Sequence, residues 1–272
     1  MRYFRRIMMS RIKVLLFVLF IGVSLSLLFC GKDEGTDNST VLGPTNEPEP
    51  ENVSLMDIDG NSYKVVKIGD QWWMAENLKV THYRNGEAIP NITDNAEWAN
   101  LKSGAYCDYN NDQSQSTMYG HLYNCYAITD DRGLAPEGWH VSTHEDWKTL
   151  QVFLGMSQDE ADKKGPSLWL GTDEGGKMKE ADTTHWSYPN NGATNSSSFT
   201  ALPAGYRYHA LAGQVGEFSG LGGIAYFWAY DPEDKSHIYS RCLRSSHSQI
   251  LQCESRPMIS MGHSIRCVRN LQ

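Results

Sequence analysis

Two histidines near the middle of the chain have a spacing that suggests metal chemistry. His140 and His144 are four residues apart, and Glu145 and Asp146 follow them directly. Histidines at this spacing act as paired metal ligands when both lie on one face of a helix. Thr143 can cap a helix that begins at His144, which places His140 outside that helix. We therefore favour structural roles for these residues, with a metal site as the alternative.

A short segment rich in Asp and Asn offers a second group of possible ligands. Asp108, Asn110, Asn111 and Asp112 carry the carboxylate and amide oxygens that Ca²⁺ prefers. However, no bidentate Glu follows at the distance found in an EF-hand, and Asx-rich loops often hydrogen-bond to their own backbone. We predict that the protein uses no cofactor, and calcium at this loop is the alternative.

Sequence motifs of covalent and metal-dependent catalysis are absent from the chain. It contains no G-x-S-x-G nucleophile motif, no H-E-x-x-H zinc motif and no glycine loop of the phosphate-binding type. The sequence therefore favours a binding protein over an enzyme and assigns no catalytic residue.

Aromatic residues are the most informative feature of the second half. Eight of them fall in a region rich in Gly, Ser and Asn: Trp169, Trp186, Tyr188, Tyr206, Tyr208, Tyr226, Trp228 and Tyr230. Exposed aromatic faces stack on sugar rings, and nearby polar groups fix the hydroxyls. We expect at least half of these aromatics to pack in the core. The residues predicted to contact a ligand are Trp186, Tyr206, Tyr208, Trp228 and Arg244.

The first thirty residues have the pattern of a secretory signal. Five basic residues and no acidic one precede an uncharged apolar stretch at residues 14–29. A membrane span, the alternative, needs about 20 apolar residues. The stretch ends at Cys30 in a sequence that resembles a lipobox, and residues 30–34 resemble the export signal of Bacteroidetes-type surface lipoproteins. The sequence therefore predicts a lipid anchor on Cys30 and a lipoprotein displayed on the outer membrane.

Removal of this leader leaves a strongly acidic chain. The full chain has 24 basic and 32 acidic residues, so loss of five basic residues leaves 19 against 32 and a formal net charge of −13. An acidic surface repels nucleic acids, which excludes that class of partner. We predict three parts: a signal peptide at 1–29, a flexible acidic tether at 30–53 and one folded domain at 54–272.

Short alternating segments and turns predict the elements of that domain. A hairpin is expected from strands at 55–58 and 63–68, followed by a strand at 71–74. Helices are expected at 95–101 and from the Thr143 cap to about Leu154. Three closing strands are expected at 224–230, 237–245 and 264–269. The pattern predicts a single, loop-rich α+β domain with twisted antiparallel strands and few helices.

Several sequence islands together resemble the Fibrobacter succinogenes major paralogous domain family. The longest runs Asp59-Gly60-Asn61-x-Tyr63, then Gly69-x-Gln71-x-Trp73-Met74-Ala75-Glu76-Asn77-Leu78; later islands are Gly138-Trp139-His140-Val141, Leu202-Pro203-x-Gly205-Tyr206-Arg207, Phe227-Trp228 and Ser264-Ile265-Arg266-Cys267-Val268-Arg269. The resemblance covers about residues 55–270 and implies a C-type-lectin-like or formylglycine-generating-enzyme-like fold. The chain departs from the family pattern at Cys125, Ala135 and Ser142.

Five cysteines remain after Cys30, and export to an oxidising compartment favours pairing. Cys242 and Cys253 bracket an expected hairpin, and Cys107 with Cys267 would join the early region to the last strand. Cys125 would then be the unpaired thiol.

Together these observations predict a surface-displayed binding or adhesion module. Its expected partner is a polysaccharide or a protein outside the cell, and only the lipid anchor would contact the membrane. Two alternatives stay open: an enzyme of the formylglycine-generating or an unknown hydrolytic type, and a structural component of the envelope.

Overall fold

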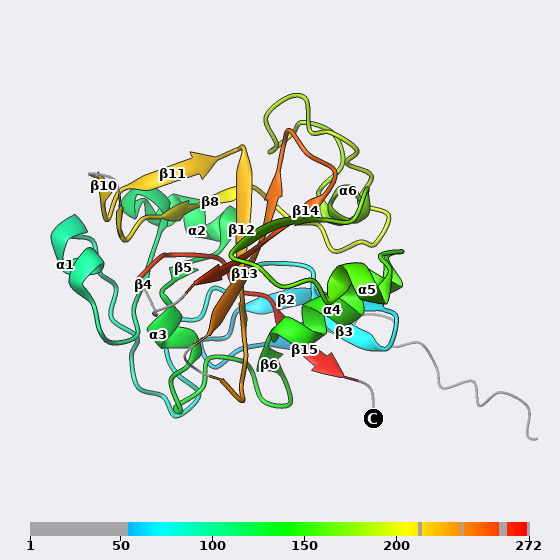
Figure 1. Cartoon of the computed structure of the whole chain (residues 1–272). Coiled ribbons are helices and arrows are strands. Elements are labelled where there is room, and N and C mark those ends of the chain that lie inside the picture. The colour runs from blue at the N-terminus through cyan, green and yellow to red at the C-terminus, as the bar shows by residue number, and fades with distance from the viewer. Residues whose placement is uncertain (1–53, 212–213, 235–236, 256–259, 271–272) are drawn as a thin grey trace, which may run out of the picture. The chain divides into compact units, whose positions relative to one another are not determined.

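A computed structural model describes residues 54–211, 214–234, 237–255 and 260–270 (Figure 1). These residues belong to one compact unit, Pro50–Gln272. The predicted signal peptide, the Cys30 anchor site and the tether lie outside the described residues. Within the described ranges, no helix has both the length and the apolar character needed to cross a bilayer.

Most of the described elements are short strands. The strands are β1 (Ser54–Met56), β2 (Ser62–Ile68), β3 (Gln71–Met74), β4 (Tyr106–Cys107), β5 (Leu122–Tyr123), β6 (His140–Val141), β7 (Ser167–Leu170), β8 (Ala204–Arg207), β9 (Ala210–Leu211), β10 (Gln214–Val215), β11 (Phe218–Leu221), β12 (Ile224–Tyr230), β13 (Ile238–Arg244), β14 (Ile250–Ser255) and β15 (Cys267–Asn270). The helices are α1 (Asn95–Asn100), the 3₁₀ helix η1 (Tyr109–Asn111), α2 (Gln113–Tyr119), α3 (Cys125–Ile128), α4 (His144–Phe153), α5 (Gln158–Ala161) and α6 (Glu174–Met178). The prediction of antiparallel strands with few helices is confirmed at this level.

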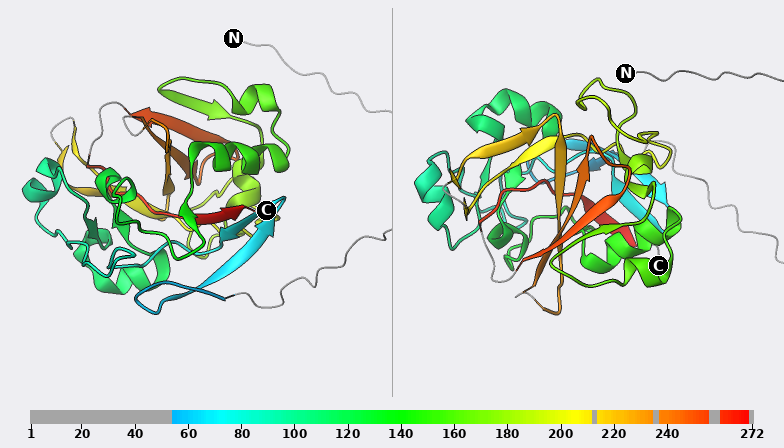
Figure 2. Two further views of the ribbon diagram at one scale, coloured as in Figure 1. Left: turned by 90° about the horizontal axis from the view of Figure 1, so that it is seen from below. Right: turned by 45° about the horizontal axis from the view of Figure 1, so that its top comes forward.

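The first sheet has the order β1-β2-β3-β15-β6. Asp57 closes the turn between β1 and β2, because its carboxylate accepts hydrogen bonds from the backbone N–H groups of Asp59 and Asn61 at 3.0 and 2.9 Å. The predicted hairpin and third strand are therefore confirmed. The last strand, β15, pairs with both β3 and β6, so the two ends of the domain lie side by side (Figure 2).

The second sheet has the order β11-β8-β12-β13-β14-β7, and all its pairings are antiparallel except β8 with β12. Successive side chains on a strand point to opposite faces. On β12, Ala225, Phe227 and Ala229 therefore pack in one apolar cluster, while Tyr226 points to the opposite, outer face, on which Trp228 is buried by the other cluster. This second face carries the candidate site.

Helix α4 covers the core face of the second sheet. Thr143 caps it in a capping box: its hydroxyl accepts from the Asp146 backbone N–H at 3.1 Å, and the Asp146 carboxylate accepts from the Thr143 backbone N–H at 2.8 Å. The apolar spacing buries Trp147 and Leu150 completely. The helix predicted from Thr143 is thus confirmed together with its cap.

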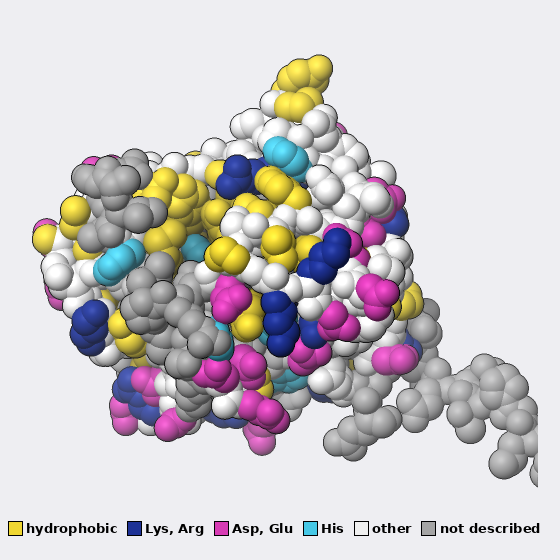
Figure 3. Space-filling model, in the orientation of Figure 1, with side chains coloured by type: hydrophobic (Ala, Val, Ile, Leu, Met, Phe, Trp, Pro, Cys, Tyr) yellow, Lys and Arg dark blue, Asp and Glu magenta, His cyan; other side chains and the backbone are white. Residues whose placement is uncertain are grey.

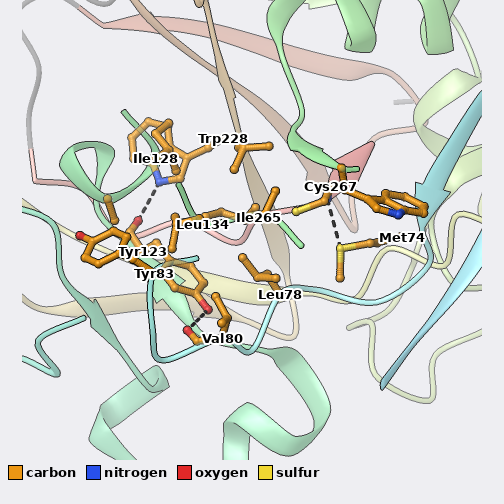
Figure 4. Packing of buried hydrophobic residues seen from close by; sticks show 14 of the residues in the cluster. Met74, Leu78, Val80, Tyr83, Tyr123, Ile128, Leu134, Trp228, Ile265 and Cys267 are labelled. Carbon is orange, nitrogen blue, oxygen red and sulfur yellow. Dashed lines mark hydrogen bonds between the residues drawn. The ribbon is translucent and has the colours of Figure 1, made fainter. Parts of the chain in front are cut away.

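Two large apolar clusters hold the sheets and helices together. In one, Trp147 from α4 meets Trp73 from β3 with ring centroids 5.2 Å apart, and Phe199 and Phe227 complete the aromatic core. The other surrounds Tyr123, whose hydroxyl donates to a backbone carbonyl at 2.7 Å (Figure 4). Aromatic pairs in such geometry each add about 1 kcal/mol beyond their buried area.

Buried cations tie distant loops to this core. The Arg266 guanidinium is 1% exposed and donates to Asn77 Oδ1 at 2.7 Å and to the Phe199 carbonyl at 2.8 Å. It also lies 4.5 Å from the centroid of the Phe199 ring. Arg207 holds the segment before α1 in the same way, donating to the Thr93 carbonyl at 2.9 Å. These arginines stabilise the framework because each satisfies several carbonyls that would otherwise be buried without donors.

The two predicted disulfides are not formed. Cys253 is directly opposite Ser240, so Cys242 lies diagonally from it on the neighbouring strand. Diagonal pairs are separated by about 7–8 Å at Cα, which is too far for a disulfide. Cys107 and Cys267 belong to different apolar clusters. None of the five described cysteines, Cys125 included, is in a disulfide.

Candidate functional site

The structure separates the five predicted ligand-contact residues into two groups. Trp186 and Trp228 are only 1% and 2% exposed, and their indole N–H groups donate to backbone carbonyls at 2.9 and 2.7 Å. Their prediction as surface contacts is wrong, because both the ring and its polar end are satisfied inside the domain. Tyr206, Tyr208 and Arg244 are half-buried and lie on the outer face of the second sheet.

The remaining late aromatics are more exposed than expected. Of the eight, only Trp186 and Trp228 are buried, so the expectation that at least half belong to the core is wrong. Tyr188 is 88% exposed in a loop. Trp169 and Tyr226 are half-buried and lie on the same face as Tyr206.

Strand register explains why these side chains share a face. Tyr226 on β12 is paired with Cys242 on β13, and Arg244 follows two residues later on the same side of β13. Leu251 on β14 is paired with both Cys242 and Trp169 on β7. A residue separation of two along each strand therefore keeps Tyr226, Arg244 and Trp169 on one surface.

The tyrosines form the first half of a continuous row. The hydroxyls of Tyr206 and Tyr208 are hydrogen-bonded at 2.7 Å, and their ring centroids lie 4.9 Å apart. The Tyr206 ring meets the Tyr226 ring edge-on at 5.1 Å. Burial and the hydrogen bond to Tyr208 raise the pKa of Tyr206 to about 12, so Tyr206 remains neutral at physiological pH.

Arg244 continues the row toward β7. Its guanidinium lies 5.6 Å from the centroid of the Trp169 ring, and the His247 ring stacks on Trp169 at 4.0 Å with the two planes 13° apart. Burial disfavours the charge of Arg244, but hydrogen bonds to Cys242 and Tyr226 outweigh it and raise the pKa of Arg244. We call the set Tyr206, Tyr208, Tyr226, Arg244, Trp169 and His247 the aromatic strip.

A buried histidine supports the strip from below. His263 is 4% exposed and stacks on Tyr226 at 4.6 Å, and its ring centroid lies 4.1 Å from that of Trp228 with the planes tilted by 34°. Burial lowers its pKa to about 3, so it is neutral at physiological pH. A neutral aromatic support holds Tyr226 in place without adding charge to the surface.

The strip is long enough to meet an extended ligand. It crosses from β8 through β12, β13 and β14 to β7, and four interstrand steps span about 19 Å. Figure 3 shows hydrophobic side chains gathered with basic and histidine side chains over the region of β8, β11 and β12. A row of partly exposed rings with hydroxyl and guanidinium donors can stack on a ligand and hydrogen-bond to it along its length.

The two ligand sets considered for metals have other roles. His140 Nε2 is 2.8 Å from the Asp146 carboxylate at the cap of α4, whereas the His144 ring stacks on Tyr239 at 3.9 Å. Asp112 caps α2 through the Ser114 backbone N–H, so this Asx chemistry is local. Across the described ranges, no three His, Cys, Asp or Glu side chains gather as a metal site would require.

Burial holds three of the described thiols in the protonated form. Burial raises the pKa of Cys107 and of Cys242 to about 12 and also raises the pKa of Cys253. A thiol in this state carries almost no thiolate at neutral pH. The strip therefore offers contacts for binding rather than a nucleophile.

Comparison with known families decides the identity of the framework. The family model of the Fibrobacter succinogenes major domain matches residues 66–269, which is more than half of the chain. The chain belongs to this family. No curated protein and no solved structure matches it.

The Fibrobacter succinogenes major domain motifs now have a physical explanation. Their residues Trp73, Asn77, Arg207 and Arg266 are buried and hold the sheets and loops together. Most of the strip lies outside these motifs. Trp169 and Tyr226 belong to the predicted aromatic group. Only the alternation of side chains along β12 could have placed Tyr226 on the outer face. No sequence signal identified His247.

Proposed function

We propose that this protein is a polysaccharide-binding module displayed outside the cell. The observation that carries the proposal is the aromatic strip, a continuous row of half-buried rings about 19 Å long. A folded domain normally buries such rings, and an exposed row of them marks a binding surface.

The polar groups of the strip suit a neutral sugar polymer. Tyr206 and Tyr208 carry hydroxyls, and Arg244 supplies a permanent donor between the rings. Apolar ring faces with a few placed polar groups are the usual composition of small-molecule and glycan sites. A protein partner is the alternative ligand for the same surface.

The location of the module is part of the proposal. The basic and apolar leader, with Cys30 at its end, supports export and acylation at that residue. Radiolabelled palmitate should enter the wild-type chain and not Cys30→Ala. Incorporation into both chains, or into neither, would contradict the anchor.

The fold relationship is also a proposal. Two sheets with short helices and long ordered loops support a framework of the C-type-lectin-like or formylglycine-generating-enzyme-like type. An experimental structure that superposes on neither fold would contradict it.

Binding of the strip can be tested with a panel of purified cell-wall and plant polysaccharides. The full chain, kept in a detergent without a sugar headgroup, is passed over each polysaccharide immobilised on a surface. We expect at least one to be bound, and we expect Tyr226→Ala and Trp169→Ala to weaken the binding at least tenfold, since one stacked ring contributes about 1.5 kcal/mol.

A matched control distinguishes the strip from general aromatic adhesion. Phe153 is 61% exposed on α4, away from the strip, and Phe153→Ala should leave binding unchanged. Retention of full binding by the two strip variants, or equal loss in the Phe153 variant, would refute the site. Capture of a protein but no polysaccharide would refute the ligand class.

A further inference from the structure

A cavity lies in the first half of the domain and shares no residue with the aromatic strip. Its volume is about 540 Å³. Its walls come from the β1–β2 turn, the segment after β3, the η1–α2 region and the start of β5; the lining residues are Asp59, Asn61, Lys79, Thr81, Asn91, Tyr106, Asp108, Asn111, Gln113, Ser116, Thr117 and His121. A pocket of this size is suited to a small molecule. We call it the polar pocket.

A buried carboxylate orients one imidazole in this pocket. His121 Nδ1 lies 2.8 Å from Asp108 Oδ1, and both residues are buried. The hydrogen bond to His121 is the main cause that lowers the pKa of Asp108, which is therefore ionised. Because an ionised carboxylate only accepts hydrogen bonds, Nδ1 of His121 is the donor in this pair, and Nε2 is the ring nitrogen left for a ligand. His121 thus brings an oriented imidazole to the pocket.

An aromatic ring lies beside the His121 imidazole. The Tyr106 ring is half-buried, lines the pocket and has its centroid 4.5 Å from the His121 ring. An aromatic side chain next to fixed polar groups provides both stacking area and direction for a polyhydroxylated ring.

Uncommitted donors complete the lining. Thr117 and Gln113 are exposed side chains on α2 that line the pocket, and Lys79 lines it without an ion pair among the described residues. By contrast, the Asp59 carboxylate already accepts from the Thr81 hydroxyl at 2.9 Å and is paired with His82. The pocket therefore offers hydroxyl, amide and ammonium donors together with the His121 imidazole.

The charges favour an uncharged ligand. One lysine faces two carboxylates, and each carboxylate is held by a histidine, so the pocket has no excess of positive charge for a phosphate or a carboxylate group. Mixed donors and acceptors around one aromatic ring match the alternating hydroxyls of a sugar. We propose that the polar pocket is a second, independent binding site for a single neutral sugar ring, free or at the end of a chain.

The test uses six neutral monosaccharides as probes: glucose, galactose, mannose, xylose, fucose and N-acetylglucosamine. Saturation-transfer NMR on the full chain, in a detergent without a sugar headgroup, detects millimolar binding. We expect at least one probe to bind, and Thr117→Val and Lys79→Met to raise its Kd at least fivefold. Both substitutions are at accessible positions whose side chains line the pocket, so the fold should be retained.

Two controls separate this pocket from the strip. Gln115 is on α2 but does not line the pocket, so Gln115→Ala should change the Kd less than twofold. Trp169→Ala should also leave monosaccharide binding unchanged while it weakens polysaccharide binding. Absence of binding by every probe up to 50 mM, or loss of binding in Trp169→Ala with retention in Thr117→Val, would overturn the proposal; the second result would leave the strip proposal intact.

Discussion

Lys179 is a buried cation that should control both the stability of the domain and the geometry of the strip. Its side chain is fully buried, and its ammonium donates to the carbonyls of Asn191, Arg244 and His247 at 2.9, 3.1 and 2.9 Å. Two of these carbonyls belong to strip residues. Lys179→Met keeps the length of the side chain but leaves three buried acceptors without a donor.

The expected cost is about 3 kcal/mol at pH 7, taking about 1 kcal/mol for each unsatisfied buried acceptor. Denaturant unfolding followed by tryptophan fluorescence measures it directly. Lys67→Met, at an exposed position on β2, is the matched control and should change the free energy of unfolding by less than about 0.5 kcal/mol. A loss below 1 kcal/mol in Lys179→Met would refute the account of its three hydrogen bonds.

The pH dependence of the unfolding free energy gives a second comparison of wild type with Lys179→Met. Burial lowers the pKa of Lys179 from its ordinary 10.5 to about 8. Between these values the unfolded chain holds this proton and the folded chain does not, so the contribution of Lys179 to stability rises with pH, by up to about 3 kcal/mol. The stability difference between wild type and Lys179→Met should therefore increase from pH 8 to pH 10. A flat or falling difference would contradict the lowered pKa.

Three further measurements test other parts of the structure. Burial lowers the pKa of His263 to about 3, so the stability that the neutral ring supports is present above pH 6.5 and is lost as pH falls toward 3, by up to about 5 kcal/mol. His263→Phe should flatten this loss of unfolding free energy at acid pH in chemical unfolding. An unchanged pH profile would contradict the neutral stacked ring. Thr143→Ala should cost about 1 kcal/mol of unfolding free energy, since it removes the cap of α4, and a neutral result would argue against the capping box. Thiol titration of the denatured, unreduced chain should find five thiols besides Cys30, whereas one would restore the two predicted disulfides.

Local sequence signals were sufficient for several elements of the fold. The alternating segments at 55–58 and 63–68 identify the first hairpin, and the Thr143 cap identifies the start of α4. These predictions succeed because the determining contacts lie within a few residues in sequence. Strand β7 was missed because its pairing is non-local: residues near 168 lie beside residues near 252.

Cysteine spacing illustrates the limit of the same reasoning. Cys242 and Cys253, eleven positions apart, correctly bracket a hairpin, but spacing cannot tell a directly opposite pair from a diagonal one. The register places Ser240 opposite Cys253, and that two-residue offset removes the disulfide. The polar pocket was missed for a related reason, since its lining comes from residues 59 to 121 and only the tertiary fold brings them together.

Charged side chains in the framework are the hardest feature to predict. Arg207, Arg266 and Lys179 have polar side chains that sequence patterns place on the surface, yet all three are buried and hydrogen-bonded to backbone carbonyls. Loop-rich domains have many carbonyls outside sheets and helices, and each long cationic side chain satisfies several of them. Composition alone therefore underestimates how much of the positive charge is structural.

The buried framework residues and the outward residues of the strip should differ in how freely they can be substituted. The backbones of β12, β13 and β7 are fixed by pairing and by the buried side chains on their inner faces, whereas Tyr226, Arg244 and Trp169 project from the outer face. Under the proposed function, substitution of a half-buried outward side chain changes binding, and because it removes less buried area than loss of a framework residue, its effect on stability is smaller. The framework residues allow no such freedom, because replacing Arg266 would leave the carbonyls of Met74, Phe199 and Thr200, in two separate segments, without donors. Ligand specificity can therefore change at the strip while the buried cations preserve the fold.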